Sequence, residues 1–330
     1  MRNGYPLVEL HRHLEGSVRL ATVLDLAGRH GVALPAWTEE ELRPHVQVVG
    51  RASSLVAFIA KFELLRRVMV DLEAVRRIAR ENLEDAAREG IDYIELRFSP
   101  YFMAETHGLA PLAVVEAVCA ELAEASGRLP IQAAILVIVS RQYGPEIGWI
   151  EVEAAIRCRE IGVVGLDLAG NELNFPGDLF VEHFRRAREA GLHAVAHAGE
   201  AAGAASVRQA VVGLGAERIG HGIRAVEDPA VLDLLAERRI ALEVCPTSNL
   251  HTNTVASYRD HPLPELLRRG LLVTLNTDDP SISGIDLAHE FRVARDEMGL
   301  AEDDLRRLQE NALAAAFLST EERGRLLAGR

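Results

Sequence analysis

Short runs of aliphatic and β-branched residues recur along the chain, and between them apolar residues repeat every three or four positions. Several of the runs, such as AAILVIV at 133–139, are continuously apolar, which is typical of parallel strands buried on both faces. The pattern predicts eight β-strands, at 7–11, 93–98, 131–139, 163–168, 193–197, 218–221, 240–245 and 272–277.

The stretches between the runs predict amphipathic helices. At 71–90, 112–126 and 180–191 the apolar residues recur at i, i+3 and i+4, with Arg and Glu elsewhere. Strands that alternate with helices indicate an α/β protein, and eight of them predict a (β/α)₈ TIM barrel. An open doubly wound sheet is disfavoured because no G-x-G-x-x-G follows the first strand.

The segment between the first two strands is longer than one crossover requires. Helical patterns at 55–69 and 71–89 predict a helical insertion, roughly 38–90, after the first strand. With no internal repeat and no obvious linker, we expect residues 1–330 to form a single barrel domain.

Polar residues gather at the C-terminal ends of the predicted strands, where barrel enzymes carry their catalytic groups. Scattered surface polarity would not select the same end of so many strands. The alternative to a catalytic site is that these polar side chains are structural and only hydrogen-bond to one another. The residues concerned are His11, His13, Arg97, Asp167, His197, Glu200, His221, Asp278 and Asp279.

Three imidazoles and a carboxylate are a ligand set that suits Zn²⁺. His11 and His13 point to one face of an extended segment, and His197 and Asp278 complete the predicted set. Zinc in an open site lowers the pKa of bound water to about 7. A second, lysine-bridged metal is not expected, because the only lysine, Lys61, lies in the insertion. Glu200, His221 and Asp279 remain for proton transfer and substrate positioning.

Charge and cysteine content narrow the partners and the compartment. The net charge of −13 argues against nucleic acid as a partner. Three distant cysteines form no disulfide framework, and the first residues lack the apolar core of a signal peptide. The longest aliphatic run is far too short to span a bilayer. We therefore expect a soluble cytoplasmic protein, and the sequence leaves its oligomeric state open.

The motifs VELHRHLEG, LRFSP, DLAGNE, HAGE, RIGHG, CPTSN and NTDDP resemble, in order and spacing, those of the adenosine deaminase family of the amidohydrolase superfamily. The resemblance covers nearly the whole chain and is strongest to bacterial adenosine deaminases. It implies zinc-dependent hydrolytic deamination of adenosine and 2′-deoxyadenosine at C6 of the purine, with one Zn²⁺ per chain.

The resemblance also implies roles for individual residues. His11, His13, His197 and Asp278 would bind the zinc. Glu200 would donate a proton to purine N1, while His221, together with Asp278, would orient and help deprotonate the attacking water. The substrate would be contacted by His13, by Glu15 near the ribose 5′-hydroxyl, by the Gly170 amide at N3 and by Asp279 at N7.

Two departures from the family pattern lie on the sugar side of the implied site. Glu15 stands where the family has an aspartate, and Asn171 replaces a carboxylate. They leave open a relative that acts on another 6-aminopurine, either aminodeoxyfutalosine or free adenine. A binding protein without activity is disfavoured because each metal and proton-transfer residue is present. The absent bridging lysine and the presence of Glu200 disfavour an amidase or phosphotriesterase.

Overall fold

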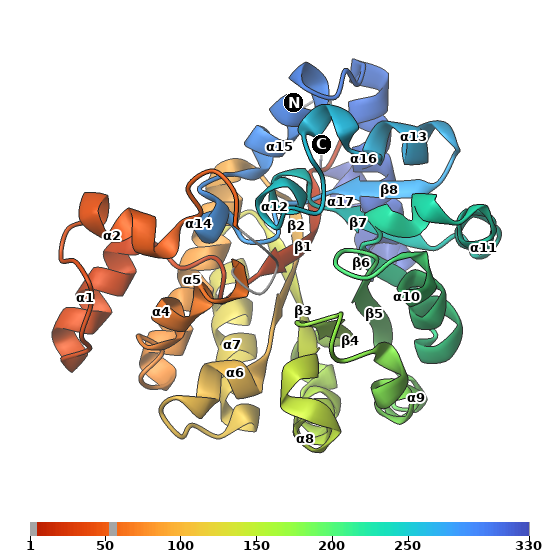
Figure 1. Ribbon diagram of the computed structural model, residues 1–330. Helices are drawn as coiled ribbons and strands as arrows, with labels where there is room; N and C mark the ends of the chain where they lie inside the picture. Colours follow the sequence, from red (N-terminus) through yellow and green to blue (C-terminus); the bar gives the residue numbers. More distant parts are fainter. Residues whose placement is uncertain (1–4, 53–57, 330) are drawn as a thin grey trace.

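The eight predicted strands form one parallel sheet that curls into a barrel, in which the spatial order of the strands follows the chain from β1 to β8 (Figure 1). The structure is a computed structural model that describes residues 5–52 and 58–329. The predicted (β/α)₈ barrel is confirmed, and each strand ends within two residues of its expected limits. The strands are β1 Val8–His13, β2 Tyr93–Phe98, β3 Gln132–Ser140, β4 Val163–Ala169, β5 His193–Ala198, β6 Arg218–His221, β7 Ala241–Val244 and β8 Leu272–Leu275.

The barrel closes between the end of β8 and β1. The backbone N–H of His13 donates to the carbonyl of Asp278 over 2.8 Å, and the N–H of Asp278 donates to the carbonyl of His11 over 3.0 Å. Two residues before Asp278, the side-chain oxygen of Asn276 accepts from the N–H of Leu10 over 2.9 Å. This closure holds Asp278 directly beside the two histidines of β1.

Helices surround the barrel on the outside (Figure 1). The helices predicted at 71–90, 112–126 and 180–191 correspond to α5, α7 and α9. The helices are α1 Leu20–His30, α2 Glu39–Val46, α4 Phe62–Arg66, α5 Leu72–Glu89, α6 Pro100–Glu105, α7 Pro111–Ser126, α8 Gly144–Arg157, α9 Val181–Glu189, α10 Ala204–Gln209, α11 Pro229–Arg238, α12 Pro246–His251, α13 Leu263–Arg268, α14 Pro280–Ser283, α15 Leu287–Asp296, α16 Glu302–Ala315 and α17 Thr320–Ala328.

Local sequence signals explain where α5 begins and ends. The carboxylate of Asp71 accepts from the N–H of Ala74 over 2.8 Å and so caps the first turn. At the other end Gly90 adopts the left-handed conformation that terminates many helices. Between these signals, the apolar face of α5 is buried against its neighbours.

The segment between β1 and α5 contains α1, α2 and α4, of which α1 and α2 project away from the ring of strands (Figure 1). Within the helical pattern expected at 55–69, α4 covers Phe62–Arg66, and residues 53–57 lie outside the described residues. The extent of the insertion, roughly 38–90, stays a prediction.

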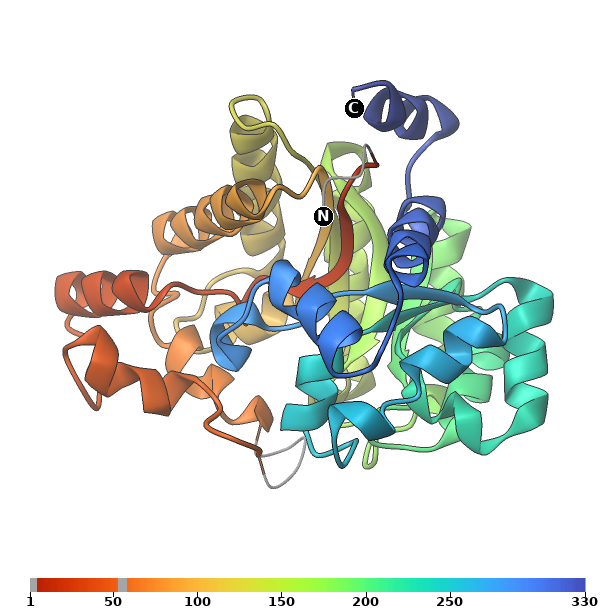
Figure 2. The same cartoon turned by 90° about the horizontal axis from the view of Figure 1, so that it is seen from above.

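The chain ends on the side of the barrel at which it began. Figure 2 shows α17 and the start of β1 at the same, upper side of the molecule. None of the helices in the described part of the chain is long and apolar enough to cross a membrane.

Candidate active site

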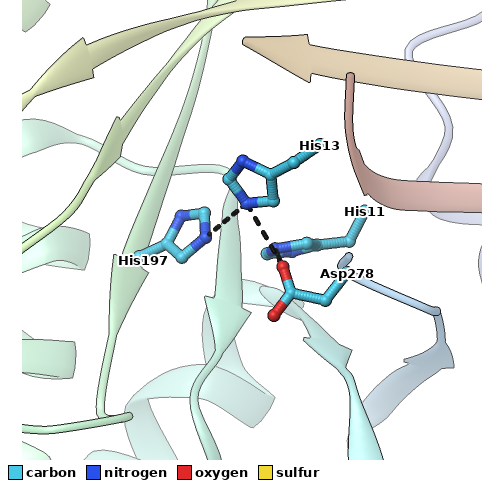
Figure 3. A group of neighbouring side chains, drawn as sticks. All are labelled: His11, His13, His197 and Asp278. Carbon is cyan, nitrogen blue, oxygen red and sulfur yellow. Dashed lines mark hydrogen bonds and ion pairs between the residues drawn. The ribbon is translucent and has the colours of Figure 1, made fainter. Parts of the chain in front are cut away.

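Four side chains from three distant strands meet at the C-terminal end of the barrel (Figure 3). They are His11 and His13 of β1, His197 of β5 and Asp278 after β8, and their nearest ligand atoms all lie within 4.8 Å of one another. Oδ1 of Asp278 is 3.1 Å from Nε2 of His11 and 3.2 Å from Nε2 of His13. Nε2 of His13 is 3.3 Å from Nε2 of His197.

The outer nitrogens of two of these imidazoles are held by buried carboxylates. Nδ1 of His11 donates to Glu243 over 2.9 Å, and Nδ1 of His197 donates to Asp167 over 3.0 Å. In the neutral form that binds a metal, an imidazole carries one proton; with Nδ1 donating, the Nε2 atoms of both rings then present lone pairs to the centre of the group.

The centre of the group fits a divalent metal ion. Nε2 of His11 and Oδ1 of Asp278 are buried and lie 3.1 Å apart, but neither makes a hydrogen bond, and a buried polar atom without one is costly. Three imidazoles and a carboxylate, with carboxylates behind the imidazoles, form a donor set that suits Zn²⁺. Burial lowers the pKa of His13 to about 4 and also lowers the pKa of His197, which favours the neutral ligand form.

One guanidinium joins the two carboxylates behind the ligands. Nη1 of Arg97 lies 2.8 Å from Asp167, and Nη2 lies 2.7 Å from Glu243. Nε of Arg218 lies 2.7 Å from the other oxygen of Glu243. Although burial alone would raise it, the two arginines hold the pKa of Glu243 well below its ordinary value. Both carboxylates therefore stay ionised and keep the imidazoles in the required orientation.

Backbone strain occurs at two residues at this end of the barrel. His221 and Asp278 have φ of 60° and 65°, and they are two of the four non-glycine residues with positive φ in the described part of the chain. Such conformations cost on the order of 1–3 kcal/mol and persist where the surroundings over-determine them. Here the strain turns both side chains toward the end of the barrel.

Glu200 is placed to act as an acid. It is buried, and burial raises its pKa well above the ordinary value, with further increases from the charges of Asp278 and Glu172. Its Oε2 lies 3.7 Å from Nε2 of His221. Burial therefore favours the protonated form of Glu200, which is the form that has a proton to give.

Glu172, on the loop after β4, holds the loop that carries Glu200. One of its oxygens accepts from the N–H of Gly199 over 2.7 Å and from the hydroxyl of Ser206 over 2.5 Å. The other accepts from three consecutive N–H groups, at 3.3, 2.8 and 2.8 Å, those of Glu200, Ala201 and Ala202. We call these five donors the amide cradle.

The tight path of this loop requires glycine at Gly199. Its φ is 69°, and an added Cβ would lie 2.5 Å from a methyl carbon of Val207. A larger residue would displace the loop, so the glycine of HAGE has a structural cause.

The predicted substrate residues line one pocket beside the four possible metal ligands. Its polar side includes Glu15, Gly170, Glu200, His221 and Asp279. Its apolar wall consists of Phe58, Ile59, Phe62 and Phe102, from the segment around α4 and from α6. A flat aromatic ring with polar edges suits such a combination.

Two acidic groups of the pocket favour their protonated forms. Burial raises the pKa of Glu15 to about 8, and one of its oxygens accepts from the N–H of Ser99 over 3.1 Å. Burial and the neighbouring charge of Asp278 raise the pKa of Asp279 well above its ordinary value. A protonated carboxyl group can donate a hydrogen bond to a ring nitrogen.

Two residues outside the predicted set also have clear positions. His193, at the start of β5, faces Glu217 over 2.9 Å and stacks on Phe317, away from the site. Cys245 is fully buried and forms, with His221 and Asp278, a second group of possible ligands within 4.8 Å.

The sequence reasoning did not identify Glu172, Glu243 or Asn249 as part of the site. Glu172 and Asn249 lie inside the motifs DLAGNE and CPTSN, so the motifs were the available signal. Glu243 belongs to a continuously buried strand, and nothing local marks it as the partner of a histidine far away in the sequence.

Comparison with known proteins gives consistent matches over the whole chain. A family model described as adenosine deaminase matches residues 6–329. An adenosine deaminase of Klebsiella pneumoniae is 51% identical over 325 residues, which cover 98% of this chain and 97% of the relative.

Solved structures share the fold. An adenine deaminase from Arthrobacter aurescens superposes with a TM-score of 0.91 at 30% identity, covering 98% of this chain and 97% of the other. An amidohydrolase from Burkholderia ambifaria with bound Zn has a TM-score of 0.86 at 25% identity, covering 98% and 89%.

Proposed function

The chain belongs to the adenosine deaminase family, and from this premise we propose that it hydrolyses adenosine and 2′-deoxyadenosine to inosine and 2′-deoxyinosine, with release of ammonia. The observation that carries the proposal is the placement of the buried Glu200 carboxyl group in the same pocket as four converging side chains that could hold a metal. Hydrolytic deamination needs an acid at the purine ring and a nucleophile at C6, and this pocket supplies positions for both.

We assign the metal to His11, His13, His197 and Asp278, and we propose one Zn²⁺ per chain. The donor set supports zinc, and the zinc-bound relative of the same fold is in line with it. When bound, the ion supplies a water of lowered pKa as the nucleophile.

The protein's own groups orient the purine and move its protons. Glu200 gives its proton to N1, which makes C6 more electrophilic. The protonated Asp279 donates to N7, and the Gly170 N–H donates to N3. The apolar wall of Phe58, Phe62 and Phe102 excludes water from the ring face.

Glu15 and His13 are proposed to contact the sugar side of the substrate. Glu15 has one buried oxygen without a hydrogen-bond partner. A hydroxyl group both donates and accepts, so it can satisfy this oxygen in either protonation state of Glu15. A ribose provides hydroxyl groups and free adenine has none, which favours a nucleoside over the base.

A substrate panel tests the proposal. We expect kcat/KM for adenosine and 2′-deoxyadenosine to exceed the values for adenine and aminodeoxyfutalosine by at least about tenfold. The loss of one hydrogen bond in a buried site lowers kcat/KM by about this factor. Ammonia release is the measurement. A higher kcat/KM for either competitor would assign the chain to that substrate.

The variant Glu200→Gln connects the activity to this pocket. Glutamine has nearly the same shape but no acidic proton, so kcat should fall by about 100-fold or more while the metal content per chain is unchanged. A variant with near-wild-type kcat would remove Glu200 from its role as the acid.

A further inference from the structure

A chain of hydrogen bonds runs behind His221, away from the pocket. Nδ1 of His221 lies 3.1 Å from the side-chain nitrogen of Asn249 on α12. The side-chain oxygen of Asn249 lies 3.2 Å from Nε2 of His261, and Nδ1 of His261 lies 3.1 Å from the backbone N–H of Leu263 at the start of α13. Asn249, His261 and His221 are all buried.

The backbone N–H at the end of this chain determines the direction of every bond in it. A backbone N–H can only donate, so Nδ1 of His261 is an acceptor and carries no proton. Burial lowers the pKa of His261 to about 3, so the ring is neutral and its one proton is on Nε2. That proton is donated to the oxygen of Asn249, which turns the amide nitrogen toward His221.

The amide nitrogen of Asn249 is a donor, so Nδ1 of His221 must accept. An accepting Nδ1 carries no proton, and an imidazole retains at least one, so the proton of His221 is on Nε2. We infer that Asn249 and His261 are positioning residues that hold the proton of His221 on Nε2 and make this ring a hydrogen-bond donor to the reacting groups. The inference rests on the proposed function for the reaction that it serves.

The N–H of His221 points into the space between two carboxyl groups. Its Nε2 is 3.7 Å from Glu200 and 3.8 Å from Asp278, which is too long for direct hydrogen bonds. An oxygen between these groups can accept from the N–H. His221 then orients the lone pairs of the attacking oxygen, and the proton of that oxygen passes to the carboxylate of Asp278.

This assignment alters the role expected for His221 from the sequence. A ring with its proton already on Nε2 has no lone pair there with which to deprotonate water. For the same reason Nε2 of His221 is not a metal ligand, because ligating imidazole nitrogens are unprotonated. This argues against the group of His221, Cys245 and Asp278 as the metal site and supports the assignment to His11, His13, His197 and Asp278.

Nitrogen NMR of the wild-type protein tests the tautomer directly. In the zinc-loaded protein with ¹⁵N-labelled histidine, and with His221→Gln used to assign the signals, we expect His221 to show a protonated Nε2 and an unprotonated Nδ1. A protonated Nδ1 in the wild type would overturn the inference. The tautomer is read from the wild-type protein without substrate, and His221→Gln serves only to assign its signals.

The variant Asn249→Asp tests the consequence for the reaction. Aspartate has the same shape but accepts at both oxygens, so Nδ1 of His221 becomes protonated to meet it. We expect kcat to fall by about 10²- to 10⁴-fold, the range seen when a catalytic histidine is held in the wrong tautomer. We expect KM to change by less than about threefold.

Asn311→Asp is the matched control. Asn311 is a buried amide on α16 that donates to the carbonyl of Val273 over 2.9 Å, away from the pocket. The change should lower the Tm without moving the His221 signals or kcat. An unprotonated Nδ1 in Asn249→Asp, or a protonated Nδ1 with kcat within threefold of wild type, would contradict the inference.

The two hypotheses fail in different ways. If the wild-type protein releases no ammonia from adenosine while His221 shows a protonated Nε2, the proposed function is wrong and the tautomer assignment stands. If adenosine is deaminated while Nδ1 is protonated, the proposed function stands and the inference is wrong.

Discussion

At the scale of single residues, the site depends on which nitrogen of each imidazole carries the proton. Asp167 and Glu243 accept from the outer nitrogens of His197 and His11, and Arg97 keeps both carboxylates ionised. Partners of this kind fix the tautomer of a metal ligand and raise its basicity. We therefore expect each carboxylate to contribute to metal affinity without contacting the ion.

Asp167→Asn should weaken metal binding. The amide cannot accept as the carboxylate does, and it also leaves a charge of Arg97 uncompensated. We expect metal affinity to fall by about 10- to 100-fold, measured by competition with a chromophoric chelator.

A similar pair at the other end of β5 supplies the control for this change. Glu217 faces Nδ1 of His193 over 2.9 Å, but this imidazole is distant from the site. Glu217→Gln should leave metal affinity unchanged. Equal losses in the two variants would show that the effect of Asp167→Asn is general destabilisation.

At the scale of elements, the loops after the strands determine where the reactive groups lie. The loop after β5 is held from the loop after β4, because the carboxylate of Glu172 binds the amide cradle. On the other side of the loop, Nη1 of Arg224 donates to the carbonyl of Ala201 over 2.6 Å. Segments without regular secondary structure are in this way given a single conformation.

Glu172→Gln should displace Glu200. In glutamine an NH₂ group replaces one of the two accepting oxygens of Glu172. This group cannot accept from the N–H donors of the amide cradle, so some of these hydrogen bonds are lost. A displacement of about 1 Å at a reacting group costs on the order of 100-fold in rate, and we expect kcat to fall by about that factor. Hydrogen exchange at the amides of Gly199 to Ala202 should become faster.

Ser206→Ala provides a graded comparison. It removes one of the five donors and retains the carboxylate, so we expect a loss of kcat of less than about fivefold. Wild-type kcat and unchanged exchange in Glu172→Gln would show that the cradle does not position Glu200.

At the scale of the whole molecule, the proposed metal ligands connect the two ends of the sheet. Two of them come from β1, one from β5 and one from the end of β8, where the barrel closes. A bound ion would therefore link strands that are far apart in the sequence. His13 and Asp278 are separated by more than 250 residues. The binding free energy of the ion would add to the stability of the barrel.

Removal of the metal should lower both stability and activity. With an ion present at about 1,000 times its Kd, binding contributes about 4 kcal/mol, so treatment with a chelator should reduce the Tm on the order of 5–15 °C. Ammonia release from adenosine should stop.

Returning Zn²⁺ should restore both the Tm and the rate, whereas Mg²⁺, which prefers oxygen ligands, should not. Full activity and an unchanged Tm in demonstrably metal-free protein would contradict the metal assignment.

The sequence by itself determined the architecture and the residue types of the site. Continuously apolar runs such as that of β3 and the periodic faces of α5, α7 and α9 are local signals, because strand and helix geometry repeat every two and 3.6 residues. The histidines and carboxylates could be predicted because they follow such runs and barrel strands bring their C-terminal ends together.

The tertiary structure alone decided how those residues are held. Glu172 and Asn249 act through backbone groups and rings contributed by other elements, and Glu243 meets His11 only after the sheet has curled. Hydrogen-bond direction, burial and the pKa values that follow from them depend on neighbours distant in the chain. For that reason the proton on His221 could be located in the folded barrel and not in the sequence.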